Sequence, residues 1–316
     1  MIIDGSNTLP EFQFESFLDN NTKNEEYSKL FAPRWAQLAG WSKKEFIKKL
    51  EVDSFESVME EIFSTLKISL SMENFLKMLR ESNVAYHAIH NMDYGRDGSE
   101  LPVDHDYIAE ILNNYPNRFI GFAGYNPHKG TESLKIVRKA LTEQGYKAVV
   151  LPPYEHGIKA DDRRYYPLYS LCDELDIPVW IHSSINYYRE TSVYIDHPSN
   201  LEAPLTDFKN LKIIAGHGGW PWIPDMIAML LKYKNLYVDT SAFRPNYIAT
   251  PNTGWDMFMY YANNLLQDKI IFGSDWLTLG IPINDFIKEV EDWPLKDSVR
   301  EKFYWKNASQ LFKLSL

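Results

Sequence analysis

Short apolar runs bounded by turn residues recur along the chain, and segments with helical periodicity separate most of them. The pattern predicts eight strands, at Met1–Asp4, Val84–His90, Phe119–Tyr125, Ala148–Leu151, Val179–His182, Lys212–Gly216, Leu236–Asp239 and Lys269–Gly273. The runs IPVWI, LKIIAG and DKIIF are almost continuously apolar, which is typical of parallel strands buried on both faces. We therefore expect one parallel sheet.

The segments between these strands have the spacing of helices. The segment TESLKIVRKALTEQG places apolar residues on one helical face and ends with Gly145, a residue typical of a helix C-cap. The segments YPLYSLCDELD and SVREKFYWKNASQLFKL have similar patterns. Alternating strands and helices form either a closed barrel or an open doubly wound sheet. No Gly-rich phosphate-binding pattern follows a strand, so the predicted fold class is α/β, a (β/α)8 TIM barrel.

A long stretch from about residue 9 to residue 71 interrupts the alternation after the first strand. It contains two segments of helical pattern, SKKEFIKKL and SFESVMEEIFSTLKI, preceded by Arg34 and Trp35. The loop after the first strand of a barrel emerges on the catalytic face, so we interpret the stretch as a helical insertion over the barrel mouth. A surface pair of helices without a role in the site is the alternative. Both readings predict a single domain over residues 1–316.

The composition fits a soluble barrel enzyme: 316 residues, 45% hydrophobic and 24% charged. The net charge of −10 argues against binding to nucleic acid or to an anionic membrane. Cys172 is the only cysteine and the N-terminal MIIDGSN lacks the pattern of a signal peptide, so we expect a cytoplasmic protein. The expected partner is a small-molecule substrate, and a homodimer is the default assembly.

Polar residues gather directly after the predicted strands. Side chains at the carboxyl ends of barrel strands converge on one pocket. His182 ends the fifth strand, His217 follows the sixth and Asp275 follows the eighth, so these three are the predicted catalytic centre. They can bind a divalent metal such as zinc, which takes imidazole and carboxylate ligands. They can equally act without metal, with His217 moving a proton and Asp275 orienting a water or the imidazole.

Other residues near the strand ends are expected to contact the substrate. The predicted substrate-binding residues are Ser6, Asn126, Tyr154, His156, Ser183, Trp222 and Trp276. Arg34, Arg189 and Arg244 are candidates to hold an anionic substrate. The histidines interpreted as structural are His87, His105, His128 and His197.

Several segments together resemble the amidohydrolase-related proteins of the aminocarboxymuconate-semialdehyde decarboxylase type, which are metal-dependent hydrolases and carboxy-lyases on a (β/α)8 barrel. These segments are IIDG, GFAGYNP, GYKAVVLPPY with the following DDRRYYPLY, IPVWIHSS, LKIIAGHGGWPW, NLYVDTSA, KIIFGSDW and WKNASQLFKL. The resemblance implies that His182 is a metal ligand, that Asp275 is a metal ligand or proton acceptor, and that His217 is the acid/base residue beside the metal.

The first strand departs from the family pattern. Members usually carry Asp-x-His-x-His there, which supplies two metal ligands, whereas this chain reads DGSNT with Ser6 and Thr8 at the two histidine positions. Hydroxyl groups are poor zinc ligands unless deprotonated. The sequence therefore predicts a metal-bound and a metal-free site about equally.

The segments GHGGWPW, PPY and DDRRYYPLY resemble a subgroup that includes hydrolases of β-ketoacyl thioesters. The leading prediction is therefore a hydrolase of a small organic acid, lactone, or β-keto acid or thioester. The alternative is a non-oxidative decarboxylase of an aromatic or unsaturated acid, in which His217 or Asp275 protonates the carbon that loses the carboxylate. A catalytically silent barrel that only binds a ligand is the third reading, motivated by the missing first-strand histidines.

Overall fold

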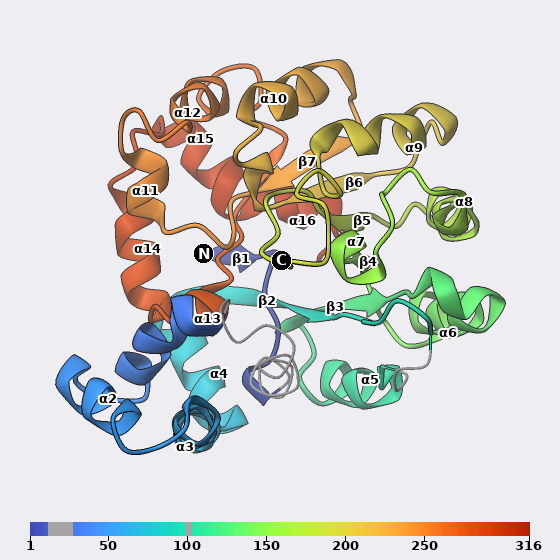
Figure 1. Cartoon of the computed structure of the whole chain (residues 1–316). Coiled ribbons are helices and arrows are strands. Elements are labelled where there is room, and N and C mark those ends of the chain that lie inside the picture. Colours follow the sequence, from blue (N-terminus) through green and yellow to red (C-terminus); the bar gives the residue numbers. More distant parts are fainter. Residues whose placement is uncertain (12–27, 99–102) are drawn as a thin grey trace.

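A computed structural model describes residues 1–11, 28–98 and 103–316. Eight parallel strands form one sheet in sequence order (Figure 1). They are β1 (Ile2–Asp4), β2 (Val84–Asn91), β3 (Phe119–Gly124), β4 (Ala148–Leu151), β5 (Val179–His182), β6 (Ile213–Gly216), β7 (Leu236–Asp239) and β8 (Ile270–Ile271). The predicted (β/α)8 barrel is confirmed. The predicted strand bounds differ most at β8, which keeps two of its five expected residues because the next amide, of Phe272, donates to the Phe303 carbonyl and not to a neighbouring strand.

Hydrogen bonds between the segments that follow β8 and β1 join the two ends of the sheet. The Gly5 amide donates to the Phe272 carbonyl at 2.9 Å, and the Asp275 amide donates to the Ser6 carbonyl at 3.0 Å. The Ser274 amide adds a bond of 3.0 Å to Oδ1 of Asp4. Closure removes the exposed edges of the sheet and directs all strand ends to a common centre.

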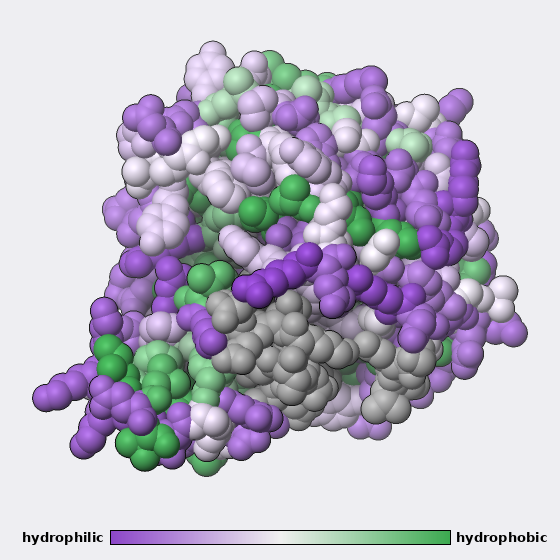
Figure 2. Space-filling view, viewed as in Figure 1, coloured by the Kyte–Doolittle hydropathy of each residue, from purple (hydrophilic) through white to green (hydrophobic). Residues whose placement is uncertain are grey.

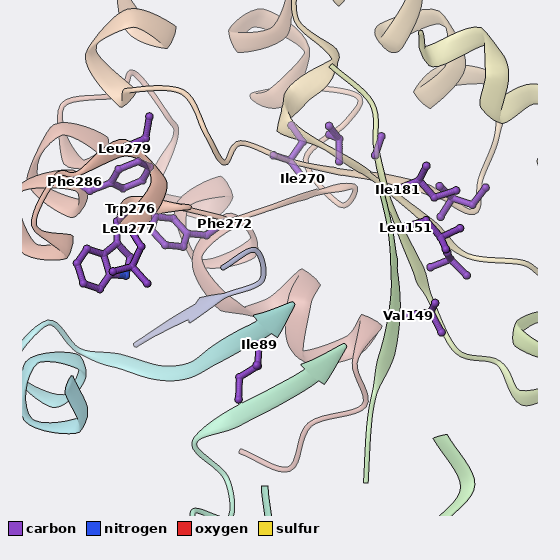
Figure 3. Close-up of a cluster of buried hydrophobic side chains, with 14 of the residues drawn as sticks. Ile89, Val149, Leu151, Ile181, Ile270, Phe272, Trp276, Leu277, Leu279 and Phe286 are labelled. Carbon is purple, nitrogen blue, oxygen red and sulfur yellow. The ribbon is translucent and has the colours of Figure 1, made fainter. Parts of the chain in front are cut away.

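Alternate residues of each strand face the barrel interior and the surrounding helices. In β4, Ala148 and Val150 belong to the interior cluster, whereas Val149 and Leu151 pack outwards in the larger core between strands and helices. Figure 3 shows the outward-facing side chains of several strands together with those of the loops and helices near β8. Phe312 also belongs to the interior cluster, and its ring lies 5.4 Å from that of Phe122.

Helices surround the barrel (Figure 1). The longer ones are α4 (Met72–Glu81), α5 (His105–Asn114), α6 (Gly130–Glu143), α8 (Tyr166–Leu175), α10 (Ile223–Lys232), α12 (Asp256–Ala262) and α14 (Ile283–Glu291). Shorter ones are α7 (Pro153–His156), α9 (Glu202–Asp207), α11 (Pro245–Ala249), α13 (Trp276–Leu279), α15 (Asp297–Glu301) and α16 (Asn307–Leu311). The predicted helices that became α6 and α8 are confirmed. The predicted C-terminal helix is divided, because a π-helical turn at Lys302–Lys306 separates α15 from α16.

The insertion between β1 and α4 is helical, as predicted, although its residues 12–27 lie outside the described ranges. It includes a helix over residues 28–38, α2 (Lys43–Leu50) and α3 (Phe55–Ser69). In Figures 1 and 2, α2 and α3 lie at the side of the barrel, where hydrophobic residues such as Val52 and Ile68 are exposed among hydrophilic ones.

The two readings of the insertion apply to different parts of it. The helix over residues 28–38 reaches the mouth of the barrel, where Ser28 and Phe31 line the main pocket. Trp35 anchors this helix, since its indole N–H donates to the Leu277 carbonyl at 3.0 Å. No residue of α2 or α3 lines that pocket. Within the described ranges, every helix is too short or too polar to cross a lipid bilayer.

Candidate active site

The main pocket lies at the carboxyl ends of the strands and brings together the three residues predicted as the catalytic centre. His182 is the last residue of β5, His217 directly follows β6, and Asp275 directly precedes α13. The rings of His182 and His217 lie 4.9 Å apart between centroids, at an interplanar angle of 70°. The cavity measures about 160 Å³. Two imidazoles and one carboxyl group therefore share a small space, as the strand-end pattern predicted.

A hydrogen-bonded chain holds His217 in place. Nδ1 of His217 lies 2.7 Å from Oγ of Ser241, and that hydroxyl donates to Oδ1 of Asp239 at 2.5 Å. The backbone amide of His217 donates to the same Oδ1 at 3.0 Å. The indole N–H of Trp180 donates to the other carboxylate oxygen at 2.5 Å. Asp239, at the end of β7, thus orients both the ring and the backbone of His217.

The histidines of the pocket are held neutral by burial. Burial lowers the pKa of His182 and His217 to about 3 each; the neighbouring His182 lowers that of His217 further, while the charge of Asp239 opposes the shift of both. His90, on β2, also lines the pocket, and burial lowers its pKa to about 3. At neutral pH these rings can accept or donate one hydrogen bond per nitrogen, but they carry no charge.

Asp275 behaves differently. Burial raises the pKa of its carboxyl group to about 7, the hydroxyl of Thr278 opposes this shift by donating at 2.7 Å, and nearby Asp4 and Asp239 raise the pKa further. Near neutral pH, a large fraction of Asp275 therefore carries a proton that it can donate. A carboxyl group poised in this way is suited to general acid catalysis.

His217 and Asp275 share an unusual backbone conformation. His217 has φ of 64° and Asp275 has φ of 48°, in the left-handed region that few residues other than glycine adopt. Ala242, which also lines the pocket, has φ of 61°. Such conformations persist where surrounding structure enforces them, and they cluster at functional sites.

His182 contacts a second buried acid. Its Nδ1 lies 3.1 Å from Oδ2 of Asp196, outside the direction of a hydrogen bond. Burial raises the pKa of Asp196 well above its ordinary value, although the amide of Asn186 donates to Oδ2 at 3.2 Å and opposes the shift. We infer a contact between two neutral groups. Asp196 supports the wall of the pocket and does not neutralise a charged His182.

The described residues do not fit a metal site of the family type. Among residues 1–11, 28–98 and 103–316, no group of three or more His, Cys, Asp or Glu side chains is placed to hold a metal ion. Catalytic zinc sites usually have three protein ligands. Ser6 and Thr8 stand at the family's histidine positions, and the Thr8 hydroxyl is used in a bond of 3.0 Å to the His90 carbonyl. The trio of His182, His217 and Asp275 is therefore not arranged as a ligand set.

Two of the seven predicted substrate-binding residues, Ser6 and Tyr154, line the pocket. The ring of Tyr154 lies 4.6 Å from that of His182 and 5.1 Å from that of Tyr188. Together with Phe31 and Phe243 these rings give the pocket an aromatic wall.

The other five predicted substrate-binding residues do not line the pocket, because their side chains bond to or pack against other parts of the protein. Asn126 and Ser183 use their side chains on backbone carbonyls, of Tyr94 and Ile181 respectively. Trp276 is fully buried, with its ring stacked 6.5 Å from that of Phe75.

His156 and Trp222 are the remaining two. The ring of His156 bridges the Tyr165 hydroxyl and the Asp93 carbonyl, both at 2.7 Å. Trp222 lies against His197, with ring centroids 4.8 Å apart. Both side chains therefore contact neighbouring residues and do not line the pocket.

The arginines proposed as anion holders do not line the pocket. Arg244 is engaged with Glu289, to which its Nε donates at 2.8 Å. Among residues 1–11, 28–98 and 103–316, none of those that line the pocket is Lys or Arg. An acidic ligand there would meet hydroxyl, amide, aromatic and imidazole groups together with the carboxyl groups of Glu155 and Asp275.

Sequence reasoning missed three residues that shape the site. His90 was predictable, since Tyr86, Ala88 and His90 share one face of β2 by the two-residue period of a strand. Asp239 and Ser241 follow the seventh strand in a polar cluster, but nothing in the sequence indicates that they bond to His217.

Comparison with known proteins gives the relationships of the chain. A family model described as amidohydrolase matches residues 72–314. The γ-resorcylate decarboxylase of Rhodococcus jostii (strain RHA1) is 21% identical over 254 residues, which cover 66% of this chain and 75% of that protein.

Solved structures resemble the whole fold. An uncharacterized TIM-barrel protein from Bordetella bronchiseptica has a TM-score of 0.70 at 21% identity, covering 99% of this chain and 98% of that one. A 5-carboxyvanillate decarboxylase from Novosphingobium aromaticivorans, complexed with manganese and 4-hydroxy-3-methoxy-5-nitrobenzoic acid, has a TM-score of 0.62 at 16% identity, covering 85% and 91%. The two with named activities are decarboxylases. The leading prediction of a hydrolase is therefore wrong, and its carboxy-lyase alternative is favoured.

Proposed function

We propose, because this chain belongs to the amidohydrolase family, that it is a non-oxidative decarboxylase of a small aromatic or unsaturated carboxylic acid. The observation that carries the proposal is the carboxyl group of Asp275, which is buried in the same pocket as neutral His217 and has a pKa of about 7. Decarboxylation needs a proton at the carbon that loses the carboxylate, and Asp275 is the group able to supply it.

The cavity supports a ligand with one ring. A volume of about 160 Å³ is close to that of an apolar cavity of about 150 Å³ known to bind benzene. Tyr154, Tyr188 and Phe243 provide flat faces for an unsaturated system. Ser6 and Ser184 lie at the pocket as neutral donors for the carboxylate.

Within the described part of the chain the pocket lining contains no Lys or Arg, and this assists loss of the carboxylate. A carboxylate that leaves water for a site without a cation is destabilised, whereas carbon dioxide and the neutral product are not. Protonation of the carbon by Asp275 places positive charge in the unsaturated system, and this charge offsets that of the carboxylate in the transition state. The site therefore disfavours the starting anion more than the transition state.

The proposed step balances in one proton. Asp275 donates its proton to the ring or vinyl carbon that bears the carboxylate, with a π electron pair forming the new C–H bond. The C–C bond then breaks, its electron pair restores the unsaturation, and carbon dioxide leaves. Asp275 remains as a carboxylate and recovers a proton from solvent. His217 accepts a hydrogen bond from the substrate.

The neighbour with bound manganese raises the question of a metal in this chain. Ser6 and Thr8 in place of histidines, and the lack of a three-ligand group among the described residues, support a site that works through its own acid and imidazole groups. We therefore include no metal in the proposed step.

The test is a panel of benzoic, hydroxybenzoic and α,β-unsaturated acids, with carbon dioxide and organic product measured. In D2O the product should carry one deuterium at the carbon that lost the carboxylate, and Asp275→Asn should abolish its formation. Ser82→Ala is the control, because Ser82 is buried at the end of α4, outside the pocket lining, and its hydroxyl donates to the Met78 carbonyl at 2.7 Å. Ligand binding without turnover by any acid, or 18O uptake from water into the product, would contradict the proposal.

A further inference from the structure

The hydroxyl of Ser241 lies between the ring of His217 and the carboxylate of Asp239, at 2.7 Å and 2.5 Å. All three groups are buried, and Ser241 and Asp239 have no exposed surface. We propose that Ser241 and Asp239 act as positioning residues that fix the tautomer of His217, with the proton on Nδ1 and the lone pair on Nε2. The inference rests on the proposed function for its catalytic meaning, but not for its geometry.

The direction of the hydrogen bonds follows from the partners of Asp239. Its carboxylate accepts from four donors: the amides of His217 and Ser241, the hydroxyl of Ser241, and the indole N–H of Trp180. In each of these four bonds the carboxylate oxygen is the acceptor. The carboxylate is therefore an acceptor only.

The serine hydroxyl has a single proton, and that proton is directed at Asp239. Its oxygen can then only accept from the imidazole. Nδ1 of His217 must be the donor in this contact, because two lone pairs cannot face each other at 2.7 Å. A neutral imidazole carries one N–H, so Nε2 is left as an acceptor.

The backbone enforces the same arrangement. The carboxylate that directs Ser241 also accepts the amide of His217, whose φ of 64° turns the residue out of the strand direction. Asp239 therefore holds the backbone of His217 directly and its ring through Ser241, so a ring flip would break the bond between Nδ1 and Ser241. A hydrogen bond to one ring nitrogen of a histidine determines which of the two nitrogens carries the proton.

The tautomer of His217 gives His217 and Asp275 different roles in the pocket. His217 accepts a hydrogen bond from an O–H or N–H of the substrate and donates none, whereas Asp275 supplies the proton to carbon. A substrate that presents a donor towards His217 is bound, and one that presents only an acceptor meets two facing lone pairs. Ser241 thereby acts on substrate orientation although it does not line the pocket.

The tautomer can be measured directly in the wild-type protein. With 15N-labelled histidine, long-range 1H–15N correlation spectra distinguish Nδ1–H from Nε2–H, and His217→Ala identifies the signals. We expect the Nδ1–H form in the wild type and a mixture of both forms in Ser241→Ala. An Nε2–H form in the wild type would overturn the inference whatever the enzyme does.

Turnover gives the second measurement. Ser241→Ala should lower kcat by about 10- to 100-fold, the range typical for loss of a hydrogen-bond partner that orients a histidine in a functional site. Ser82→Ala, which removes a buried hydroxyl far from the pocket, should leave both kcat and the His217 signals unchanged. Unchanged kcat in Ser241→Ala, together with a shifted tautomer, would remove the catalytic role. A wild type with the expected tautomer and no decarboxylation would instead count against the proposed function alone.

Discussion

The backbone amide of Asp275 donates to the carbonyl of Ser6 at 3.0 Å, so the acid after β8 is tied to the residue that replaces a family histidine after β1. The same bond helps to close the barrel. The chemistry of the pocket therefore depends directly on the junction between the two ends of the sheet. A substitution at Ser6 therefore alters the immediate surroundings of Asp275.

The first prediction concerns metal. Purified protein should contain less than one equivalent of Mn, Zn or Fe by elemental analysis, and EDTA should leave turnover unchanged. The double variant Ser6→His/Thr8→His restores the family's two first-strand ligands beside His182 and Asp275, so it should bind Mn2+ in a titration followed by electron paramagnetic resonance. Stoichiometric metal in the wild type, or inactivation by EDTA, would contradict the expectation.

The second prediction is the pH dependence of turnover. The acid form of Asp275 is required, and its pKa is raised to about 7, so kcat should be constant from about pH 4 to 6 and fall as pH rises through 7. Neutral His217 sets no limit in this range, since its pKa is lowered to about 3. A rate that rises between pH 6 and 8 would show that a base, not this acid, limits the reaction.

A third prediction tests whether Asp275 causes the fall of kcat above pH 6, called the alkaline limb of the pH profile below. Thr278 donates to its carboxylate at 2.7 Å and lowers its pKa. Thr278→Val removes the bond, which is worth about 1 kcal/mol, so the limb should move to higher pH by about one unit. Ser82→Ala should leave the limb in place. A limb that does not move in Thr278→Val would assign it to another group.

The fourth prediction tests the contact of Gly216 and Trp180 beneath the pocket. A Cβ at position 216 would lie 2.2 Å from the Trp180 ring, which is fully buried. Gly216→Ala should therefore lower the free energy of unfolding by roughly 2 to 3 kcal/mol and weaken the indole bond to Asp239. Gly145→Ala is the control: its added Cβ meets open space, and only its positive φ of 81° should cost about 1 kcal/mol. Equal losses in chemical denaturation would refute the packing argument.

The fifth prediction compares two ion pairs. Lys129 lies 2.6 Å from Asp93, and both side chains are largely buried. Lys129→Met leaves the carboxylate in a buried site, so stability should fall by about 3 kcal/mol. Lys77 and Glu81 form an exposed pair at 3.9 Å, and Lys77→Met should change stability by less than about 0.5 kcal/mol. The difference between the two variants, measured by urea denaturation, is the decisive quantity.

The strand pattern was enough to predict the order of the barrel and the meeting of His182, His217 and Asp275. Apolar runs identify buried parallel strands, and parallel strands in a closed sheet place their carboxyl ends at one centre. This argument needs only local information and the chain order. It also located the insertion, whose end near residue 71 agrees with the start of α4 at Met72.

The tertiary structure alone decided which polar residues face the pocket and what protonation they carry. Asn126 and Ser183 follow strands as His182 does, yet their side chains bond to backbone carbonyls. The bond from Ser241 to His217 and the raised pKa of Asp275 depend on burial and on partners from other strands. Side-chain direction after a strand end is set by whichever unpaired group lies within reach, and only the folded chain brings those groups together.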